Sequence, residues 1–67
     1  MKPETIFGVN AGVVWNILHS KGPLSADAIS KATKLKAIEV YGALGWLGRE
    51  GKIEIVSESN RTNFKLV

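Results

Sequence analysis

The sequence predicts an α+β fold in which three helices are followed by a two-stranded antiparallel hairpin. Hydrophobic residues recur at helical spacing as far as Gly51, and from Lys52 onward they alternate with polar residues. The chain has 67 residues, which is one domain at most. We therefore expect residues 1–67 to form a single domain.

The composition limits what this small domain can be. No cysteine is present, so neither a disulfide nor a thiolate–zinc site stabilises it. The formal net charge of +3 is compatible with a nucleic-acid partner but does not require one. The first residues do not resemble a secretory signal, and the longest uncharged run is too short and too polar to span a membrane. We therefore expect a cytoplasmic protein with no membrane association.

The first helix is expected to begin at Glu4 or Thr5 and to end at Ser20 or Lys21, before the break at Gly22–Pro23. Residues 5–20 contain no Asp, Glu, Lys or Arg. One face of this helix is apolar, with Phe7 among its residues. The opposite face is uncharged as well, and it carries Gly8, Gly12, Trp15 and His19.

A helix without a charged face is usually covered on both sides, and a domain of this size has too little chain to cover both. We therefore expect a homodimer whose contact lies on the first helix. Gly8 and Gly12 would allow close approach, Trp15 would be the anchor, and His19 lies on the same face. The alternative is that Trp15 packs on the C-terminal hairpin of its own chain.

A second helix is expected from Ala26 to about Thr33, with Ser25 as its N-cap. A tight turn then leads into the longer helix of the stretch Leu35–Gly51. A short helix, a turn of three or four residues and a longer helix form a helix-turn-helix.

The longer helix has two different faces. The core face is expected to hold Val40, Ala43, Leu44 and Leu47. The opposite face carries Ile38, Gly42, Gly45 and Arg49, with Tyr41 and Gly48 on its shoulder. Glycine costs about 1 kcal/mol relative to alanine inside a helix. We therefore expect a phosphate or a partner surface pressed against Gly42 and Gly45 to offset this cost.

The hairpin is predicted from the change of period after Gly51, a residue suited to the left-handed end of a helix. Two alternating runs flank the polar segment 57–62, which predicts a loop of about four to six residues. The residues expected to face the core are Ile53, Ile55, Phe64 and Leu66.

This order of elements resembles the winged helix-turn-helix superfamily, in which the hairpin is the wing. The residues that carry the resemblance are Leu24–Ser25, Leu35, Val40, Ala43, Leu44, Leu47, Gly51 and Ile53. Over almost its whole length the chain is similar to a family of short stand-alone winged-helix proteins of unknown function from bacteria and archaea. That similarity is carried by the segments GVNAGVVW (8–15) and ALGWLGREGKI (43–53).

The chain departs from the superfamily pattern at two positions. Lys34 stands in the turn where glycine is often found, so a left-handed backbone there would be strained. Lys36 stands where a Ser, Thr or Asp cap is expected before the recognition helix, with Glu39 three residues later.

The resemblance implies that the exposed face of the third helix enters the major groove of double-stranded DNA and that the wing contacts the backbone. On this chain the base-reading positions would include Lys36, Ile38 and Tyr41, and Ile38 is suited to a thymine methyl group. Phosphate contacts would come from basic residues at the turn and the wing. These basic residues are Lys31, Lys34, Lys36, Arg49, Lys52, Arg61 and Lys65.

The predicted function is therefore DNA binding, in a small transcriptional regulator that acts as a homodimer. The alternative is a winged-helix module that binds a protein partner and has no sequence-specific contact with DNA. In that case the lysines would serve solubility.

No catalytic pattern is visible in the sequence. His19 is the only histidine, Ser25 is interpreted as a helix cap, and no phosphate-binding loop of the G-x-x-x-x-G-K-[ST] type occurs. No cluster of His, Cys and acidic residues has the spacing of a metal site. We therefore expect no enzymatic activity, no metal, no cofactor and no small-molecule ligand.

Overall fold

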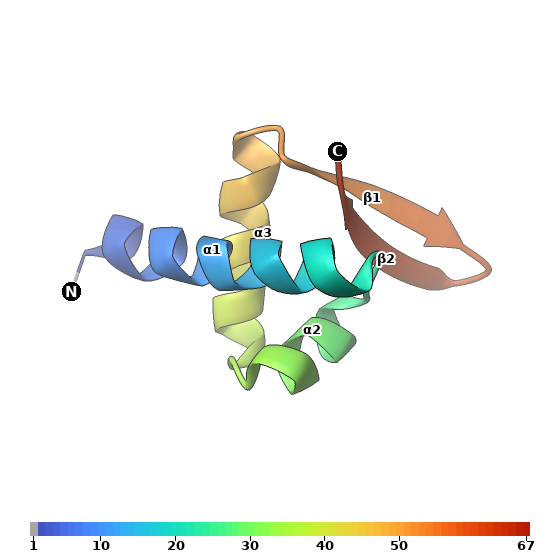
Figure 1. The fold of residues 1–67 in the computed structure, drawn as a ribbon, viewed down its shortest axis with the longest axis horizontal. Helices are drawn as coiled ribbons and strands as arrows, with labels where there is room; N and C mark the ends of the chain where they lie inside the picture. Colours follow the sequence, from blue (N-terminus) through green and yellow to red (C-terminus); the bar gives the residue numbers. More distant parts are fainter. Residues whose placement is uncertain (1) are drawn as a thin grey trace.

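The computed structural model describes residues 2–67, and Met1 lies outside them. The elements, in chain order, are α1 (Pro3–Lys21), α2 (Ala26–Thr33), α3 (Ala37–Arg49), β1 (Ile53–Glu58) and β2 (Arg61–Leu66). Figure 1 shows α1 crossing α3, with α2 beside them and the hairpin projecting from one side. The predicted order of three helices and an antiparallel hairpin is confirmed.

Helix α1 begins at Pro3, slightly earlier than the sequence predicts. Proline is well suited to the first helical position, because its missing N–H would have no partner there. The helix ends at Lys21, and the backbone N–H of Gly22 donates to the Leu18 carbonyl over 2.9 Å. Gly22 has φ 79°, a conformation that glycine adopts without strain.

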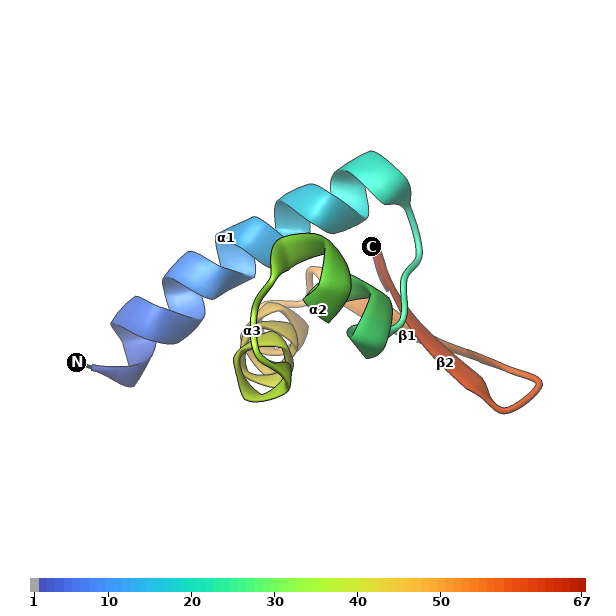
Figure 2. The same cartoon turned by 90° about the horizontal axis from the view of Figure 1, so that it is seen from below.

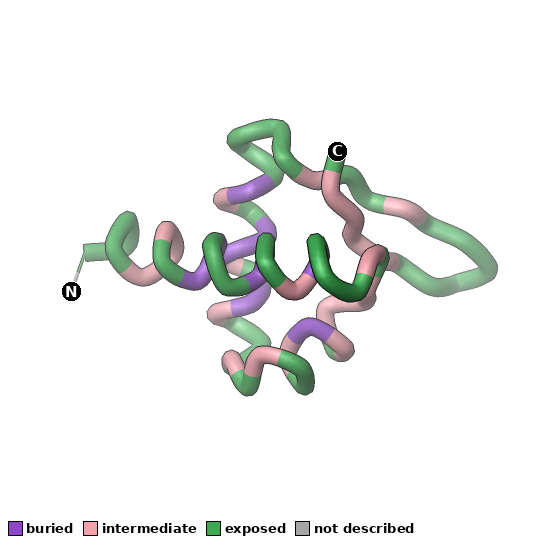
Figure 3. The backbone as a smooth tube through the Cα atoms, viewed as in Figure 1, coloured by how far each residue is buried: buried purple, intermediate pink, exposed green. Residues whose placement is uncertain are grey.

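The core lies where α1, α2 and α3 meet (Figure 3). Val14 from α1, Ile29 from α2 and Val40 from α3 are completely buried. The core face predicted for α3 is confirmed, since all four of its residues are buried, and the whole buried set is Ala11, Val14, Leu18, Ile29, Val40, Ala43, Leu44 and Leu47.

The hairpin is attached to the helices at its base. Leu24, in the connection between α1 and α2, exchanges two backbone hydrogen bonds of 3.0 and 2.8 Å with Phe64 of β2. β2 therefore lies between Leu24 and β1. The sequence did not predict this bridge, because a single bridging residue produces no alternating pattern.

The tip of the hairpin is tighter than expected. Glu58 pairs with Arg61, so the loop consists of Ser59 and Asn60 alone, and the prediction of a four- to six-residue loop is wrong. Both loop residues have positive φ, 44° and 68°. Two such residues suit the type I′ turn that matches the twist of two paired strands.

One predicted core position of the wing is also wrong. Ile55 is 66% exposed, whereas Ile53, Phe64 and Leu66 pack against the core. Figure 2 shows the reason, because the hairpin extends beyond the helices and only its base lies against them. The alternating pattern identifies one face of a strand but does not show how far the core reaches along it.

Candidate nucleic-acid interface

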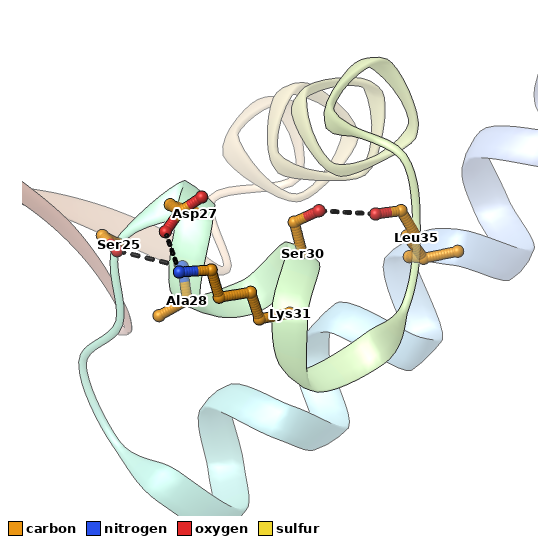
Figure 4. Close-up of polar contacts among 6 residues, drawn as sticks. All are labelled: Ser25, Asp27, Ala28, Ser30, Lys31 and Leu35. Atoms are coloured by element: carbon orange, nitrogen blue, oxygen red, sulfur yellow. Dashed lines mark hydrogen bonds and ion pairs between the residues drawn. The ribbon is translucent and has the colours of Figure 1, made fainter.

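The turn between α2 and α3 is held by side chains in place of a glycine. Lys34 has the left-handed conformation, with φ 63° and ψ 17°, and its N–H donates to the Ser30 carbonyl over 2.8 Å. The Ser30 hydroxyl donates to the Leu35 carbonyl over 2.6 Å (Figure 4). The Thr33 hydroxyl donates to the Ile29 carbonyl over 2.7 Å. These bonds fix the path of the chain through the turn and keep a lysine at its corner.

The start of α2 is capped as predicted. The Ser25 hydroxyl oxygen accepts a hydrogen bond of 3.1 Å from the Ala28 backbone N–H (Figure 4). Lys31, one of the predicted phosphate contacts, lies 3.1 Å from the Asp27 carboxylate, one helical turn away. Both side chains of this ion pair are more than three-quarters exposed, so its contribution to stability is small.

Glu39, in the first turn of α3, takes the place of the missing N-cap side chain. The backbone N–H of Lys36 donates to the Glu39 carboxylate over 2.9 Å. A carboxylate in the first turn also interacts favourably with the positive end of the helix dipole. The Lys36 side chain takes no part in this bond and is exposed.

The exposed face of α3 is mostly apolar. Its exposed residues are Ala37, Ile38, Tyr41, Gly45, Gly48 and Arg49. Ile38 is 77% exposed and Tyr41 60%, which are large fractions for side chains of this size. Arg49 is the only charged residue on this face.

Gly42 does not lie on this face, and the expectation that a phosphate or an external partner presses on it is wrong. A Cβ atom at Gly42 would lie 2.5 and 2.7 Å from two ring atoms of Phe7. The residue pressed against Gly42 is therefore an aromatic ring from α1 of the same chain. At Gly45, in contrast, apart from its own helix backbone and its chain neighbours, no atom of the described residues lies within 4 Å of the position of a Cβ.

An apolar groove of about 580 Å³ separates α3 from the wing. Tyr41, Gly45 and Gly48 lie on its α3 side, and Leu44, Ile53, Ile55 and Phe64 complete its lining. This groove was not predicted from the sequence. The available signal was the spacing of Tyr41, Gly45 and Gly48, which places a large side chain and two glycines on one side of a helix.

The predicted phosphate contacts form two groups. Lys52 lies 3.6 Å from the Glu50 carboxylate and Lys65 lies 3.9 Å from that of Glu54, so these lysines, like Lys31, have a carboxylate partner. Within residues 2–67 the other members of the set form no ion pair, and all are exposed: Lys34, Lys36, Arg49 and Arg61. These four cations lie at the turn, at the two ends of α3 and at the tip of the wing.

The predicted contact face of α1 is only partly free. Gly8 is half-buried, with the Trp46 ring 3.8 Å from the position of a Cβ. Gly12 is exposed, and apart from its own helix backbone and chain neighbours no atom of the described residues lies within 4 Å of that position. Trp15 stacks on His19 with a centroid distance of 5.0 Å and remains 36% exposed.

The part of the chain that the structure describes holds neither a metal-ligand cluster nor a membrane-spanning helix. Among residues 2–67 no group of three or more His, Cys, Asp or Glu side chains is placed to hold a metal ion. In the same range no helix has both the length and the apolar character needed to cross a membrane.

Comparisons with known proteins agree with this architecture. The model of a winged helix-turn-helix domain family, DUF2582, matches residues 1–66. The solution NMR structure of protein BT2368 from Bacteroides thetaiotaomicron is similar to this chain with a TM-score of 0.91 at 28% sequence identity, over 97% of this chain and 79% of that chain. No curated protein matches. The predicted resemblance is confirmed, and the chain belongs to the winged helix-turn-helix domain family DUF2582.

Proposed function

We propose that this protein binds double-stranded DNA and acts as a small transcriptional regulator, with α3 in the major groove and the wing against the backbone. The observation that carries the proposal is the placement of the four cations that lack a carboxylate partner within residues 2–67. Lys34 and Lys36 precede α3, Arg49 ends it, and Arg61 lies at the wing tip. This function implies a cytoplasmic location.

The charges predict the character of the binding. Each phosphate neutralised by a lysine or arginine releases counterions, so the affinity falls as the salt concentration rises. The ion-paired residues Lys31, Lys52 and Lys65 contribute less, because a phosphate must compete with a carboxylate already within 4 Å. We expect modest affinity with a clear salt dependence.

We also propose that the protein acts as a homodimer through α1. The supporting observation is an exposed, uncharged surface on a helix, where charged residues are the rule. Val9 is 65% exposed and Val13 41%, and Gly12 and Trp15 lie on the same helix. A second copy of α1 would cover apolar area on both protomers, as symmetric dimers do.

The test of DNA binding is fluorescence anisotropy of a labelled duplex, measured at low and at moderate salt. The variant is Lys34→Glu/Lys36→Glu, and the control is Lys2→Glu/Lys21→Glu, which changes the net charge equally at the two ends of α1. We expect the wild type and the control to bind in a salt-dependent manner and the first variant to lose binding. Equal loss in both variants would mean that net charge, and not this surface, determines binding.

A protein-binding module is the second candidate function, and the apolar groove between α3 and the wing is the observation that favours it. Exposed apolar surfaces of this kind are typical of interaction sites. Absence of duplex binding even at low salt would favour this candidate over the first.

A further inference from the structure

The face of α3 that would meet the bases has no side chain suited to reading them by hydrogen bonds. Arg, Asn and Gln make the bidentate contacts that distinguish base pairs. Between the N-cap Lys36 and Arg49 at the far end, the exposed face holds only Ala37, Ile38, Tyr41 and two glycines. The hydroxyl of Tyr41 is the only polar side-chain group in this interval of the face. Sequence preference on this face must therefore come mainly from apolar contact.

Ile38 is the most exposed large hydrophobic side chain among residues 2–67, at 77%. It is the second residue of α3, in the first turn, which is the part of a recognition helix that contacts base edges. Tyr41, 60% exposed, follows three residues later and lies on the same side of the helix. Ile38 and Tyr41 together form a broad exposed apolar surface at the N-terminal end of α3.

The helix backbone is open to close approach one turn further on. Apart from the helix's own backbone and the chain neighbours, no atom of the described residues lies within 4 Å of a Cβ placed at Gly45, and the same is true at Gly48. Since neither Phe7 nor any other side chain covers these two glycines, the packing that accounts for Gly42 does not account for them. With no side chain in the way, a flat partner surface can lie against the α3 backbone at these positions.

We propose that α3 reads the methyl groups of thymine, with Ile38 as the main contact and Tyr41 as the second, so that the protein prefers duplexes rich in A·T pairs. The C5-methyl of thymine is the apolar group that the four base pairs present in the major groove. This inference rests on the proposed DNA-binding function and specifies its ligand.

The charges around the face favour DNA over a protein helix as its occupant. Lys34 and Lys36 lie at one end of the apolar face and Arg49 at the other, and none has an ion-pair partner within residues 2–67. An apolar strip bounded by cations at both ends matches a row of methyl groups between two phosphate backbones. The carboxylate at the start of the helix, that of Glu39, is engaged by the Lys36 N–H.

The experiment compares an A·T-rich duplex with the same duplex in which every thymine is replaced by deoxyuridine. This replacement removes the methyl groups and leaves every hydrogen-bonding group of the bases in place. Burial of one methyl group corresponds to about a fourfold change in affinity. We expect the wild type to bind the thymine duplex at least that much more tightly, measured by anisotropy at low salt.

The variant Ile38→Ala tests whether Ile38 is responsible for the preference for thymine. Its side chain is 77% exposed, so its truncation leaves the core intact. Val67→Ala is the control, because Val67 is 75% exposed and follows β2, so it is not part of the exposed face of α3. We expect Ile38→Ala to reduce the ratio between the two duplexes toward one while it still binds the deoxyuridine duplex, and Val67→Ala to keep the wild-type ratio.

The outcomes separate this inference from the proposed function. Salt-dependent binding with equal affinity for both duplexes would overturn methyl reading and leave DNA binding standing. A thymine preference that survives in Ile38→Ala would overturn the assignment to Ile38. No binding of either duplex at low salt would overturn both. As the converse test, methylation of cytosine at C5 in a G·C-rich duplex is expected to raise the affinity, and no change would count against methyl reading.

Discussion

Gly42 and Gly45 look alike in the sequence but have different roles in the structure. The ring of Phe7 from α1 occupies the space that a side chain at Gly42 would need. Gly45 faces open space one turn away. Helical periodicity gives the direction of each glycine but not the identity of a neighbour from a distant element, so the sequence predicted an external partner at both.

Substitution by alanine should have opposite effects on stability at these two glycines. Gly42→Ala should destabilise the protein by about 1–3 kcal/mol, because its methyl group must displace the Phe7 ring from a packed position. Gly45→Ala should stabilise it by about 0.5–1 kcal/mol, because alanine loses less backbone entropy in a helix. Urea denaturation measures both changes. A loss of stability in Gly45→Ala would show that its surroundings are not open.

Asn10 is a second residue whose effect on stability depends on its burial. It is 8% exposed, and its Nδ2 atom is buried without a hydrogen-bond partner among the described residues. A buried donor left unpaired costs about 1–3 kcal/mol.

We predict that Asn10→Leu raises the free energy of unfolding by about 1 kcal/mol or more, since it removes this cost. Asn16→Leu is the matched control, because Asn16 is exposed on the same helix and the change in helix propensity is the same. Both are measured by thermal or urea unfolding. An equal effect of the two substitutions would mean that the Asn10 amide is satisfied.

The turn between α2 and α3 is the element in which the sequence and the structure agree most closely. The predicted limits of α2, the Ser25 cap and the turn at Lys34 are all confirmed. They could be predicted because caps and turns depend on residues a few positions apart. The bonds from the Ser30 and Thr33 hydroxyls, which stabilise the turn without glycine, involve the same short range.

We predict that Lys34→Gly stabilises the protein but weakens its binding to DNA. The φ of 63° is costly for lysine and free of strain for glycine, so the substitution should raise stability by about 0.5–1 kcal/mol. It also removes a cation from the proposed interface, so duplex binding should weaken. Denaturation and anisotropy are measured on the same sample. Unchanged duplex binding would mean that Lys34 is not part of the DNA interface.

Two apolar surfaces of the molecule are left uncovered within the part of the chain that the structure describes. One is the face of α1 with Val9 and Val13, and the other is the face of α3 with its groove toward the wing. The lack of charges in residues 5–20 predicted an uncovered surface on this helix, but the residues predicted for it were Gly8, Gly12, Trp15 and His19. The groove was not predicted, because it depends on how the hairpin sits on the helices, which the Leu24–Phe64 bridge determines.

Substitutions on the surface of α1 test the proposed homodimer. Gly12→Leu and Trp15→Ala should each shift the sedimentation of the protein toward the monomer, because one introduces bulk at an open contact and the other removes the anchor. Ala37→Leu, at an exposed position on α3, is the control for added bulk. A wild-type protein that sediments as a monomer at all concentrations would contradict the dimer.

The measurement that tests the central claim most directly is a titration of isotope-labelled protein with an A·T-rich duplex, followed by amide chemical shifts in NMR spectra. We predict that the largest shifts cluster at Lys34–Tyr41, Gly45–Arg49 and Arg61, with little change along the exposed face of α1. Shifts confined to α1, or no shifts at low salt, would contradict the claim that the helix-turn-helix and the wing form a DNA-binding surface.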